Sequence, residues 1–512
     1  MSTKKILAVL LALFVLATAV SGCGNSGSSS ADSQSGSSAT SENSASTEDT
    51  ASTDGEVPTI SLMVVCGTTP PDADAVAEKL SEITREKIGC NVEFITMEIG
   101  NVAQQLNLLL SGGDDTLDVF MAGISVPYST IVNNGQALSL DTLMEPYAEE
   151  VKTALGEKVY ESGRVNGELY GIGRLLDQAS TACYNLRGDI AEEFGYKNGD
   201  KVDLAELTEL FGKIREKYPD TPLIGPMNGV PNIVDSRIDS LGNKLGVLDN
   251  YGQDTTVTNY YESAGYEELV GYFKQWKEMG CYMADFLNVT DAPIDYIPSG
   301  KAFGCFASHF SAEMNGLWSS QNFGTDIASL QIYEDAVAVT PVAYECINPA
   351  TKNPEAAAAL IYLMATDPDV ENLLINGIEG QHYQVLEDNT ATYVDGKDIS
   401  TTGWGLGYSW TALNSTISIP FEYPADYYDR LIEANKNAQQ SKAFGCQFDL
   451  TGVSDAVSAC TNVVNQYENA LAGGAVEDFD ATLAQFQQAL RDAGIDEIVA
   501  AKQEQLDAFL AG

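Results

Sequence analysis

The sequence has little positive charge and almost no histidine. Its 512 residues carry 27 Lys and Arg against 73 Asp and Glu, which gives a formal net charge of −46 at pH 7. Nucleic-acid binding depends on Lys and Arg neutralising phosphates, so this balance argues against a nucleic-acid partner. It equally disfavours adhesion to anionic lipid head groups, and we attribute the acidic excess to solubility.

The apolar run at residues 6–20 is too short, and wrongly flanked, for a comfortable membrane-spanning helix. It follows Lys4 and Lys5 and ends in small residues, which is typical of a secretory signal. The sequence Val-Ser-Gly-Cys at 20–23 resembles the bacterial lipobox, in which the cysteine is acylated and becomes the mature N-terminus. We therefore expect residues 1–23 to be a lipoprotein signal peptide, with palmitate-type chains on Cys23. The alternative is an ordinary cleaved signal with an incidental cysteine.

Residues 24–57 have too little apolar surface to form a core. Ser, Gly, Ala and Thr dominate this segment, which predicts a disordered tether. Together with an acylated Cys23, it would hold the folded body on the outer face of the cell membrane. The remaining 450 or so residues exceed the size of a single core, so two or more lobes are expected.

Signatures of catalysis are sparse. His309 and His382 are the only histidines and stand far apart, which leaves a metal site little support. The sequence has no Ser-His-Asp order and no nucleotide-binding loop, so we expect neither a cofactor nor enzyme activity. One alternative stays open, a lipid-anchored glycoside hydrolase, because such an enzyme requires only a pair of carboxylates.

Cysteines show no CxxC spacing. Apart from Cys23, eight remain, and an even number outside the cytosol suggests disulfides. Most of them, however, lie in apolar runs. Cys66 ends one predicted strand and Cys90 precedes the next, which puts them at opposite ends of a parallel pair, beyond the roughly 7 Å limit for bridging. We predict mostly buried free thiols, and whether any of them pair stays open.

The folded body opens with alternating strands and helices. Strands are predicted at residues 59–66, 92–97 and 117–121, with helices from about 73 to 87 and from 102 to 112 between them. This order implies an α/β fold with a parallel sheet that is covered on both faces, and ligands gather at the carboxyl ends of such strands. Those ends are residues 67–72 and 122–128.

Later segments predict a second α/β lobe and a helical end. Extended segments at 181–186 and 223–224 flank helices at 188–194 and 203–217. Asn353 is the predicted N-cap of a helix that Pro354 starts, and the chain is almost wholly helical from Asp449. We expect an N-terminal lobe at 58–182 with a returning segment at about 336–395, a second lobe at 183–335, and a helix-rich region at 396–512 packed on the second lobe.

Several short motifs together resemble a known family. They are Asn-Gly-Glu-Leu-Tyr-Gly-Ile at 166–172, Cys-Tyr-Asn-Leu-Arg at 183–187, Ser-Gly-Lys-Ala at 299–302, Asn-Pro-Glu-Ala-Ala at 353–357, Gly-Ile-Glu-Gly-Gln-His-Tyr at 377–383, and Phe-Gly-Cys-Gln-Phe-Asp at 444–449. In this order, behind a lipobox, they resemble the extracellular solute-binding proteins of sugar-importing ABC transporters, although Gly173 replaces the usual proline. The nearest subgroup is the oligosaccharide-binding lipoproteins with an extended helical C-terminus.

This resemblance implies the two-lobed, type II periplasmic-binding-protein-like fold, with a ligand in the cleft and hinge closure around it. The partners implied are a small-molecule ligand, probably an oligosaccharide by family, and the permease subunits of an ABC importer, with membrane contact through the N-terminal lipid. A monomer is expected. The same fold could instead bind a peptide or another non-sugar solute, and which sugar it would bind does not follow from the residues.

A cleft for neutral sugars needs flat aromatic surfaces and planar polar side chains. The densest aromatic cluster is Trp404, Tyr408 and Trp410, for which ligand stacking and ordinary core packing are both open. We predict that Trp404→Ala or Trp410→Ala weakens sugar binding by about 1–3 kcal/mol and leaves the fold intact. By position in the family pattern, further candidates are Asp72, Tyr128, Asp177, Gln178, Asn228, His309 and Phe310, each with a structural role as the alternative.

Overall fold

The computed structural model describes residues 57–112, 115–175, 178–226, 231, 233–333, 336–405 and 411–511. The predicted signal peptide, the tether and Cys23 lie outside these residues. Within them, no helix combines the length and the apolar character needed to cross a membrane.

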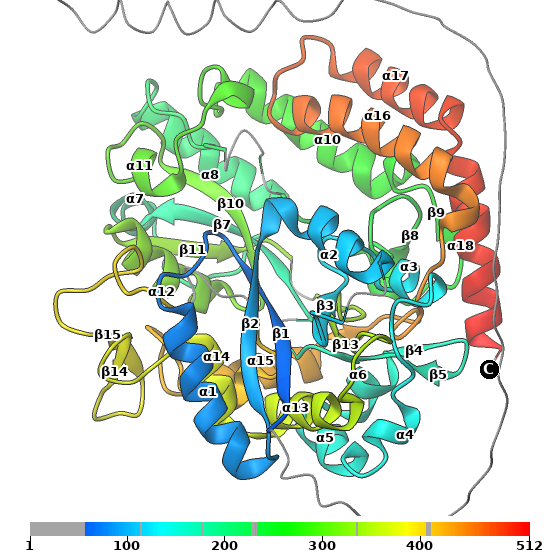
Figure 1. Ribbon diagram of the computed structural model, residues 1–512. Helices are drawn as coiled ribbons and strands as arrows, with labels where there is room; N and C mark the ends of the chain where they lie inside the picture. Colours follow the sequence, from blue (N-terminus) through cyan, green and yellow to red (C-terminus); the bar gives the residue numbers. More distant parts are fainter. Residues whose placement is uncertain are drawn as a thin grey trace, which may run out of the picture. The chain divides into compact units, whose positions relative to one another are not determined.

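The first sheet has five strands in the order β2-β1-β3-β13-β6 (Figure 1). β1 (Thr59–Cys66) pairs in parallel with β2 (Asn91–Glu98) and with β3 (Val119–Ala122), as the strand–helix alternation predicted. The expectation of a wholly parallel sheet is wrong at its other edge. There β13 (Tyr344–Ile347) runs antiparallel to both β3 and β6 (Gly171–Gly173), because the chain returns to this sheet from the opposite direction.

Alternating side chains of β1 pack into two hydrophobic cores, one on each face of the first sheet. Ile60, Leu62 and Val64 pack with helices α1 (Ala73–Lys87), α5 (Ala148–Leu155), α13 (Pro354–Thr366) and α14 (Pro368–Asn376). Met63 and Val65 face the other way, toward α2 (Val102–Ser111) and α3 (Tyr128–Asn133). The sheet is therefore covered on both faces, which is the period-two pattern expected of a buried strand.

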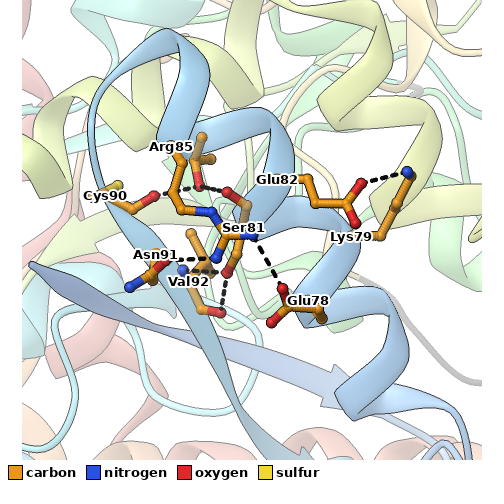
Figure 2. A network of polar contacts seen from close by, with 9 residues as sticks. Glu78, Lys79, Ser81, Glu82, Arg85, Cys90, Asn91 and Val92 are labelled. Atoms are coloured by element: carbon orange, nitrogen blue, oxygen red, sulfur yellow. Dashed lines mark hydrogen bonds and ion pairs between the residues drawn. The ribbon is translucent and has the colours of Figure 1, made fainter. Parts of the chain in front are cut away.

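Polar contacts fix helix α1 to the start of β2 (Figure 2). The Ser81 hydroxyl donates to the Val92 carbonyl at 3.0 Å and accepts from the Val92 amide at 2.8 Å. The Thr84 hydroxyl donates to the Cys90 carbonyl at 2.8 Å, and Arg85 reaches Asn91 at 2.9 Å. These side chains satisfy backbone groups at the strand entry that would otherwise be unpaired in the interior.

The start of α13 differs in one detail from its prediction. Asn353 occupies the N-cap position and Pro354 the first turn, but the Asn353 side chain makes no capping hydrogen bond. Instead, the Asn353 amide donates to the Thr351 hydroxyl at 3.2 Å. The proline, which needs no amide partner, is what begins the helix here.

The second sheet has three antiparallel strands in the order β10-β7-β11. They are β7 (Thr181–Arg187), β10 (Gly304–His309) and β11 (Ile327–Gln331), and α8 (Leu204–Lys217), α10 (Ala264–Glu278) and α12 (Ala312–Phe323) pack around them. The strand predicted at 223–224 forms only a single bridge, between Ile224 and Tyr282. Two residues are too few to extend the sheet by a further ladder.

Three helices close the described chain, as the helical pattern after Asp449 predicted. α16 (Ser454–Ala472) and α17 (Phe479–Asp492) lie beside α10, and α18 (Ile495–Leu510) contacts α16, α17 and β9 (Val257–Thr258), in orange to red in Figure 1. Phe486 of α17 contacts Tyr261 with ring centroids 4.8 Å apart, and both belong to the core beneath the second sheet. The C-terminal helices therefore share their hydrophobic core with β7, α8 and α10.

Several segments cross between the two sheets. Gly173 ends β6 of the first sheet, and Thr181 begins β7 of the second. A second crossing pairs β12 (Val337–Ala338) with β16 (Gln439–Gln440) in parallel, and Ala338 also bridges to Ala179. The sheets are thus joined by crossings that touch one another.

All eight cysteines of the described residues are buried and free, as their apolar settings predicted. Cys66 lies at the end of β1 and Cys90 lies just before β2, at opposite ends of the parallel pair. Burial raises the pKa of the Cys183, Cys305 and Cys446 thiols to about 12, which keeps them protonated and unreactive.

We therefore expect no alkylation of the native protein lacking residues 1–57, and eight alkylated cysteines after denaturation without reductant. Intact-mass measurement before and after denaturation checks this count. Absence of labelling in denaturant would mean that the thiols are paired.

Candidate functional site

A pocket of about 290 Å³ lies at the carboxyl edge of the first sheet. Four stretches of chain contribute its lining, within residues 123–129, 239–243, 339–344 and 443–450. The first follows the end of β3 and the third leads into β13, while the other two come from outside this sheet. Ligands of open α/β sheets gather at this edge, so the pocket lies where the strand order predicted a site.

Gly123 allows the chain to pass closely beneath this pocket. It follows β3 with φ at 109°, and a Cβ atom there would sit 1.8 Å from the Val342 carbonyl oxygen. The Gly123 amide donates to the Val126 carbonyl at 2.8 Å, which turns the chain back toward Tyr128. Only glycine fits a position that is both left-handed and this crowded.

Two stacked tyrosines line the side of the pocket nearest the first sheet. The rings of Tyr128 and Tyr344 are 4.1 Å apart between centroids. The Tyr128 hydroxyl donates to the Gly163 carbonyl at 2.5 Å, and the Tyr344 hydroxyl donates to Ser162 at 3.1 Å. Burial raises the pKa of both phenols well above the ordinary value, so they remain neutral.

Gln447 joins this tyrosine pair to the C-terminal part of the chain. Its amide nitrogen donates to the Tyr344 hydroxyl at 2.7 Å and to the Ser162 carbonyl at 3.1 Å. Phe448, the next residue, also lines the pocket, and its carbonyl accepts from the Ser129 hydroxyl at 2.7 Å. Rings and amide groups are therefore held in fixed positions by hydrogen bonds that do not depend on a ligand.

The remaining side of the pocket is the pocket loop, residues 239–246. Asp239 is buried, and its carboxylate accepts the Leu241 amide at 2.9 Å. Burial raises the pKa of Asp239, because a buried carboxylate loses its hydration. Among the described lining residues Asp239 is the single carboxylic acid, so the pocket itself holds no carboxylate pair.

Three further predicted residues gather around helix α15 (Tyr427–Asn437). The backbone amides of Gln178 and Ala179 donate to the Asn435 side chain at 3.0 and 3.2 Å. Phe310 contacts Tyr427 with ring centroids 5.3 Å apart, and His309 lies against Phe310 at 4.5 Å. The structure thus brings Gln178, His309 and Phe310 to one helix, near the start of β7 and the end of β10.

His309 is a neutral, hydrogen-bonded histidine. Its Nδ1 accepts the Ser311 amide at 3.2 Å, and burial lowers the pKa of the imidazole to about 4. Gln178 differs, since its amide nitrogen Nε2 is buried and has no hydrogen-bond partner among the described residues. A buried donor without a partner is costly, which makes Gln178 a candidate for ligand contact.

Asp72 and Trp404 lie apart from the pocket and hold neighbouring segments together. His382 Nδ1 accepts the Ile378 amide at 2.8 Å, so its Nε2 carries the proton and donates to Asp72 at 3.0 Å. This hydrogen bond lowers the pKa of Asp72. Trp404 is fully buried, its indole donates to the Leu374 carbonyl at 3.1 Å, and the structure therefore favours core packing for it over ligand stacking.

Asp177, Asn228, Tyr408 and Trp410 lie outside the described residues, and their ligand contacts stay predictions. Sequence reasoning missed Asp239, Tyr344 and Gln447. Gln447 falls in a motif that carried the family resemblance, at 444–449, which was the available signal. For Asp239 and Tyr344 the sequence offered no such signal. Among the described residues, no group of three or more His, Cys, Asp or Glu side chains could hold a metal ion.

Two α/β sheets joined by crossing segments, with a pocket at the edge of the first, define the type II solute-binding fold. A crystal structure of an N-glycan transport solute-binding protein from Streptococcus pneumoniae matches with a TM-score of 0.76 at 22% identity, over 89% of this chain and 99% of that one. An HMO-binding, ABC-transporter-associated solute-binding protein from Bifidobacterium longum infantis matches with a TM-score of 0.62 at 16% identity. The match covers 88% of this chain and 99% of that one. The predicted fold is confirmed.

Sequence comparison agrees with the motifs. A carbohydrate ABC transporter substrate-binding protein of Streptococcus pneumoniae is 24% identical over 474 residues, 90% of this chain and 92% of that protein. Lipoprotein LipO of Bacillus subtilis is 23% identical over 320 residues, 56% and 62% of the two chains. Residues 442–511 match a family model described as a domain of unknown function, DUF3502. The resemblance to solute-binding proteins of carbohydrate ABC transporters is confirmed.

Proposed function

We propose that this chain is an extracytoplasmic solute-binding protein that captures an oligosaccharide between its two lobes and delivers it to an ABC importer. The observation that carries this proposal is similarity to a carbohydrate substrate-binding protein over nine-tenths of the chain. The pocket at the carboxyl edge of the first sheet supplies a matching location for the ligand. We place the folded body at the outer face of the membrane, held by a lipid on Cys23.

The pocket chemistry favours a neutral sugar over an anionic one. Tyr128 and Tyr344 are neutral but almost fully buried, so the half-buried Phe448 supplies the ring that a sugar face can reach. The Gln447 amide nitrogen already donates to Tyr344 and Ser162, which leaves its side-chain carbonyl oxygen to accept from a sugar hydroxyl. An anionic sugar would also approach a protein with a formal net charge of −46, which repels like charge at a distance. Aromatic rings and amides bind the C–H faces and hydroxyls of neutral sugars.

Binding without turnover is the activity we infer. A glycoside hydrolase needs two carboxyl groups about 5–9.5 Å apart on either side of the scissile bond. The described lining of the pocket supplies one carboxylic acid, Asp239, and the full-length relative is named a substrate-binding protein. Both observations favour transport over hydrolysis.

Crystal structures of the N-glycan transport solute-binding protein from Streptococcus pneumoniae hold Man1GlcNAc and Man5GlcNAc. Calorimetry with these two glycans tests this proposal on the protein without residues 1–57. We expect saturable heat with at least one glycan of a neutral panel. Gln447→Ala should weaken binding about fivefold to tenfold, the loss expected for one hydrogen-bonding group. Gln488→Ala, an exposed glutamine on α17 away from the pocket, should leave the affinity unchanged.

Two outcomes would contradict the proposal. No heat from any carbohydrate would remove sugar as the ligand class, and a thermal-shift screen of peptides and other solutes would then identify the cargo. Release of shorter sugars from a glycan incubated with excess protein would indicate a hydrolase. The anchor has its own test, because Cys23→Ser should release the protein from the membrane fraction.

A further inference from the structure

We propose that the C-terminal helical segment, residues 442–511, is a wall of the ligand pocket, and that Lys502 of α18 holds the pocket loop in the conformation that binds ligand. This gives a role to a segment whose family model describes no function. The part that concerns ligand affinity rests on the proposed function. The part that concerns the loop does not, and can be measured without any sugar.

Lys502 is buried, and every hydrogen bond of its ammonium group goes to the pocket loop. Nζ donates to the Leu241 carbonyl at 3.0 Å, to the Gly246 carbonyl at 3.1 Å and to the Asn243 side chain at 2.7 Å. A lysine ammonium has three donors, so none is left over. One side chain thereby fixes three points along eight residues of loop.

The loop has a conformation that needs such support. Leu241 and Lys244 are in the left-handed region, with φ at 44° and 59°, and Gly242 and Gly246 have φ at 90° and 92°. Left-handed conformations are costly for residues with side chains and persist only where surrounding contacts hold them. The stem of Lys502 also packs here, since a Cβ atom on Gly246 would lie 3.2 Å from its Cδ.

Burying a lysine ammonium at this position costs desolvation free energy that an apolar side chain would not. The buried residues beside it on α18 are Ile495, Ile498 and Leu506, so an apolar side chain would continue the stripe. Burial lowers the pKa of Lys502 to about 7, and the carboxylate of Asp239 partly offsets this shift. A buried charge of this kind is better explained by what it positions than by net stability.

Other charged groups near the loop are already paired. Lys244, from the loop itself, forms an ion pair with Glu468 of α16 at 3.1 Å. Asp239 is the one charged group that acts on the Lys502 ammonium within the described part of the chain. The protonation state of Lys502 therefore depends on Asp239, a residue of the loop that Lys502 holds.

Helix α18 also holds Asp449, at the start of the C-terminal segment. Gln505 accepts the Asp449 amide at 2.7 Å and donates to the Asp449 carbonyl at 2.8 Å, next to Phe448, which lines the pocket. The Phe448 ring centroid is 5.8 Å from Lys502 Nζ. One turn of α18 thus fixes both the pocket loop and residues 447–449.

Amide hydrogen exchange of the ligand-free protein tests the loop contacts directly. In Lys502→Met, exchange of the amides at 241–248 should become at least tenfold faster, while the β1 amides keep their protection. Lys274→Met is the matched control, because Lys274 also contacts the C-terminal segment, through Asp480, but is exposed and away from the pocket. Unchanged exchange in Lys502→Met would overturn the inference.

Calorimetry with Man5GlcNAc tests the consequence for binding. Lys502→Met should weaken affinity at least tenfold, and Asn243→Ala, which removes the side-chain oxygen that accepts from Lys502 and from the Leu245 amide, should weaken it severalfold. Wild-type affinity should fall as the pH rises from 6 to 8, because Lys502 loses its charge and one N–H donor over this range, and the fall should be smaller in Lys502→Met.

The outcomes separate the two proposals. Failure of the wild-type protein to bind any glycan refutes the proposed function and leaves the exchange result standing. Equal affinity of the wild-type, Lys502→Met and Asn243→Ala proteins would show that ligand binding does not depend on the contacts of Lys502 with the pocket loop. That result would overturn the inference. Should Lys502→Met fail to fold, hydrogen exchange of ligand-free Asn243→Ala decides the matter, because Asn243 lines the pocket and its affinity change alone does not report on the loop. Unchanged exchange at 241–248 in that variant would overturn the inference.

Discussion

Replacing Trp404 with alanine is expected to lower the free energy of unfolding by about 3–5 kcal/mol, the cost of emptying a large aromatic site in a core. Trp404 is fully buried among residues of the first sheet and its helices. Its ring stacks on Phe94 at 5.4 Å between centroids, and its indole N–H donates to the Leu374 carbonyl. Truncation would leave a cavity and an unpaired acceptor. Urea denaturation followed by circular dichroism measures the change.

Trp318→Ala is the matched control for this experiment. Trp318 lies on α12 with 40% of its surface exposed, so its removal should cost less than about 1 kcal/mol. The sequence alone predicted weaker sugar binding and an intact fold for Trp404→Ala. The burial of Trp404 supports the alternative that was left open, a structural role in the core. An unfolding free energy equal to the wild type, combined with lost glycan binding, would restore Trp404 to the ligand site.

The first three strands could be predicted because their information is local. An apolar strand such as 59–66, followed by a turn and an amphipathic helix, specifies the β1–α1–β2 unit without reference to distant residues. The rule that ligands gather at carboxyl ends then placed Tyr128 near the site, and the pocket includes it. The strands and the strand-end region 122–128 followed from spacing and order along the chain, whereas Tyr128 itself was a candidate by its position in the family pattern.

Features that depend on distant contacts could not be predicted. β13 joins the first sheet antiparallel to β3, a partner more than two hundred residues earlier, and nothing in Tyr344–Ile347 encodes that direction. Asp239 lines the pocket from a loop whose carbonyls at Leu241 and Gly246 accept from Lys502 of α18, a contact between segments far apart in the sequence. In the sequence, Lys502 interrupts an apolar stripe and resembles an ordinary exposed lysine.

Three ionisable side chains are buried together behind the edge of the first sheet. Glu345 of β13 is fully buried, and neither of its carboxyl oxygens has a hydrogen-bond partner among the described residues. Arg174 is close enough to attract it, and Glu371 is buried in the same cluster. Burial raises the pKa of Glu345 to about 7 and that of Glu371 to about 8, because desolvation outweighs the attraction of one guanidinium.

These raised pKa values make stability depend on pH with a defined sign. Between the ordinary glutamate pKa of 4.5 and the folded value, the folded protein binds more protons than the unfolded chain. The free energy of unfolding should therefore fall as the pH rises from 4.5 to about 7. For Glu345 the loss is about 3 kcal/mol, at 1.4 kcal/mol for each unit of pKa difference.

Glu345→Gln isolates this contribution, because glutamine has the same shape and stays neutral. The variant should match the wild type at about pH 4, below the unfolded pKa, and exceed its unfolding free energy by about 3 kcal/mol at pH 8. Glu371 continues to titrate in the variant, so its pH slope between 4.5 and 7 should be about half that of the wild type. Exposed Glu86→Gln is the control and should leave the slope unchanged. Urea titrations at half-unit pH intervals give the slope, and equal slopes for Glu345→Gln and the wild type would mean that Glu345 is ionised in the folded protein.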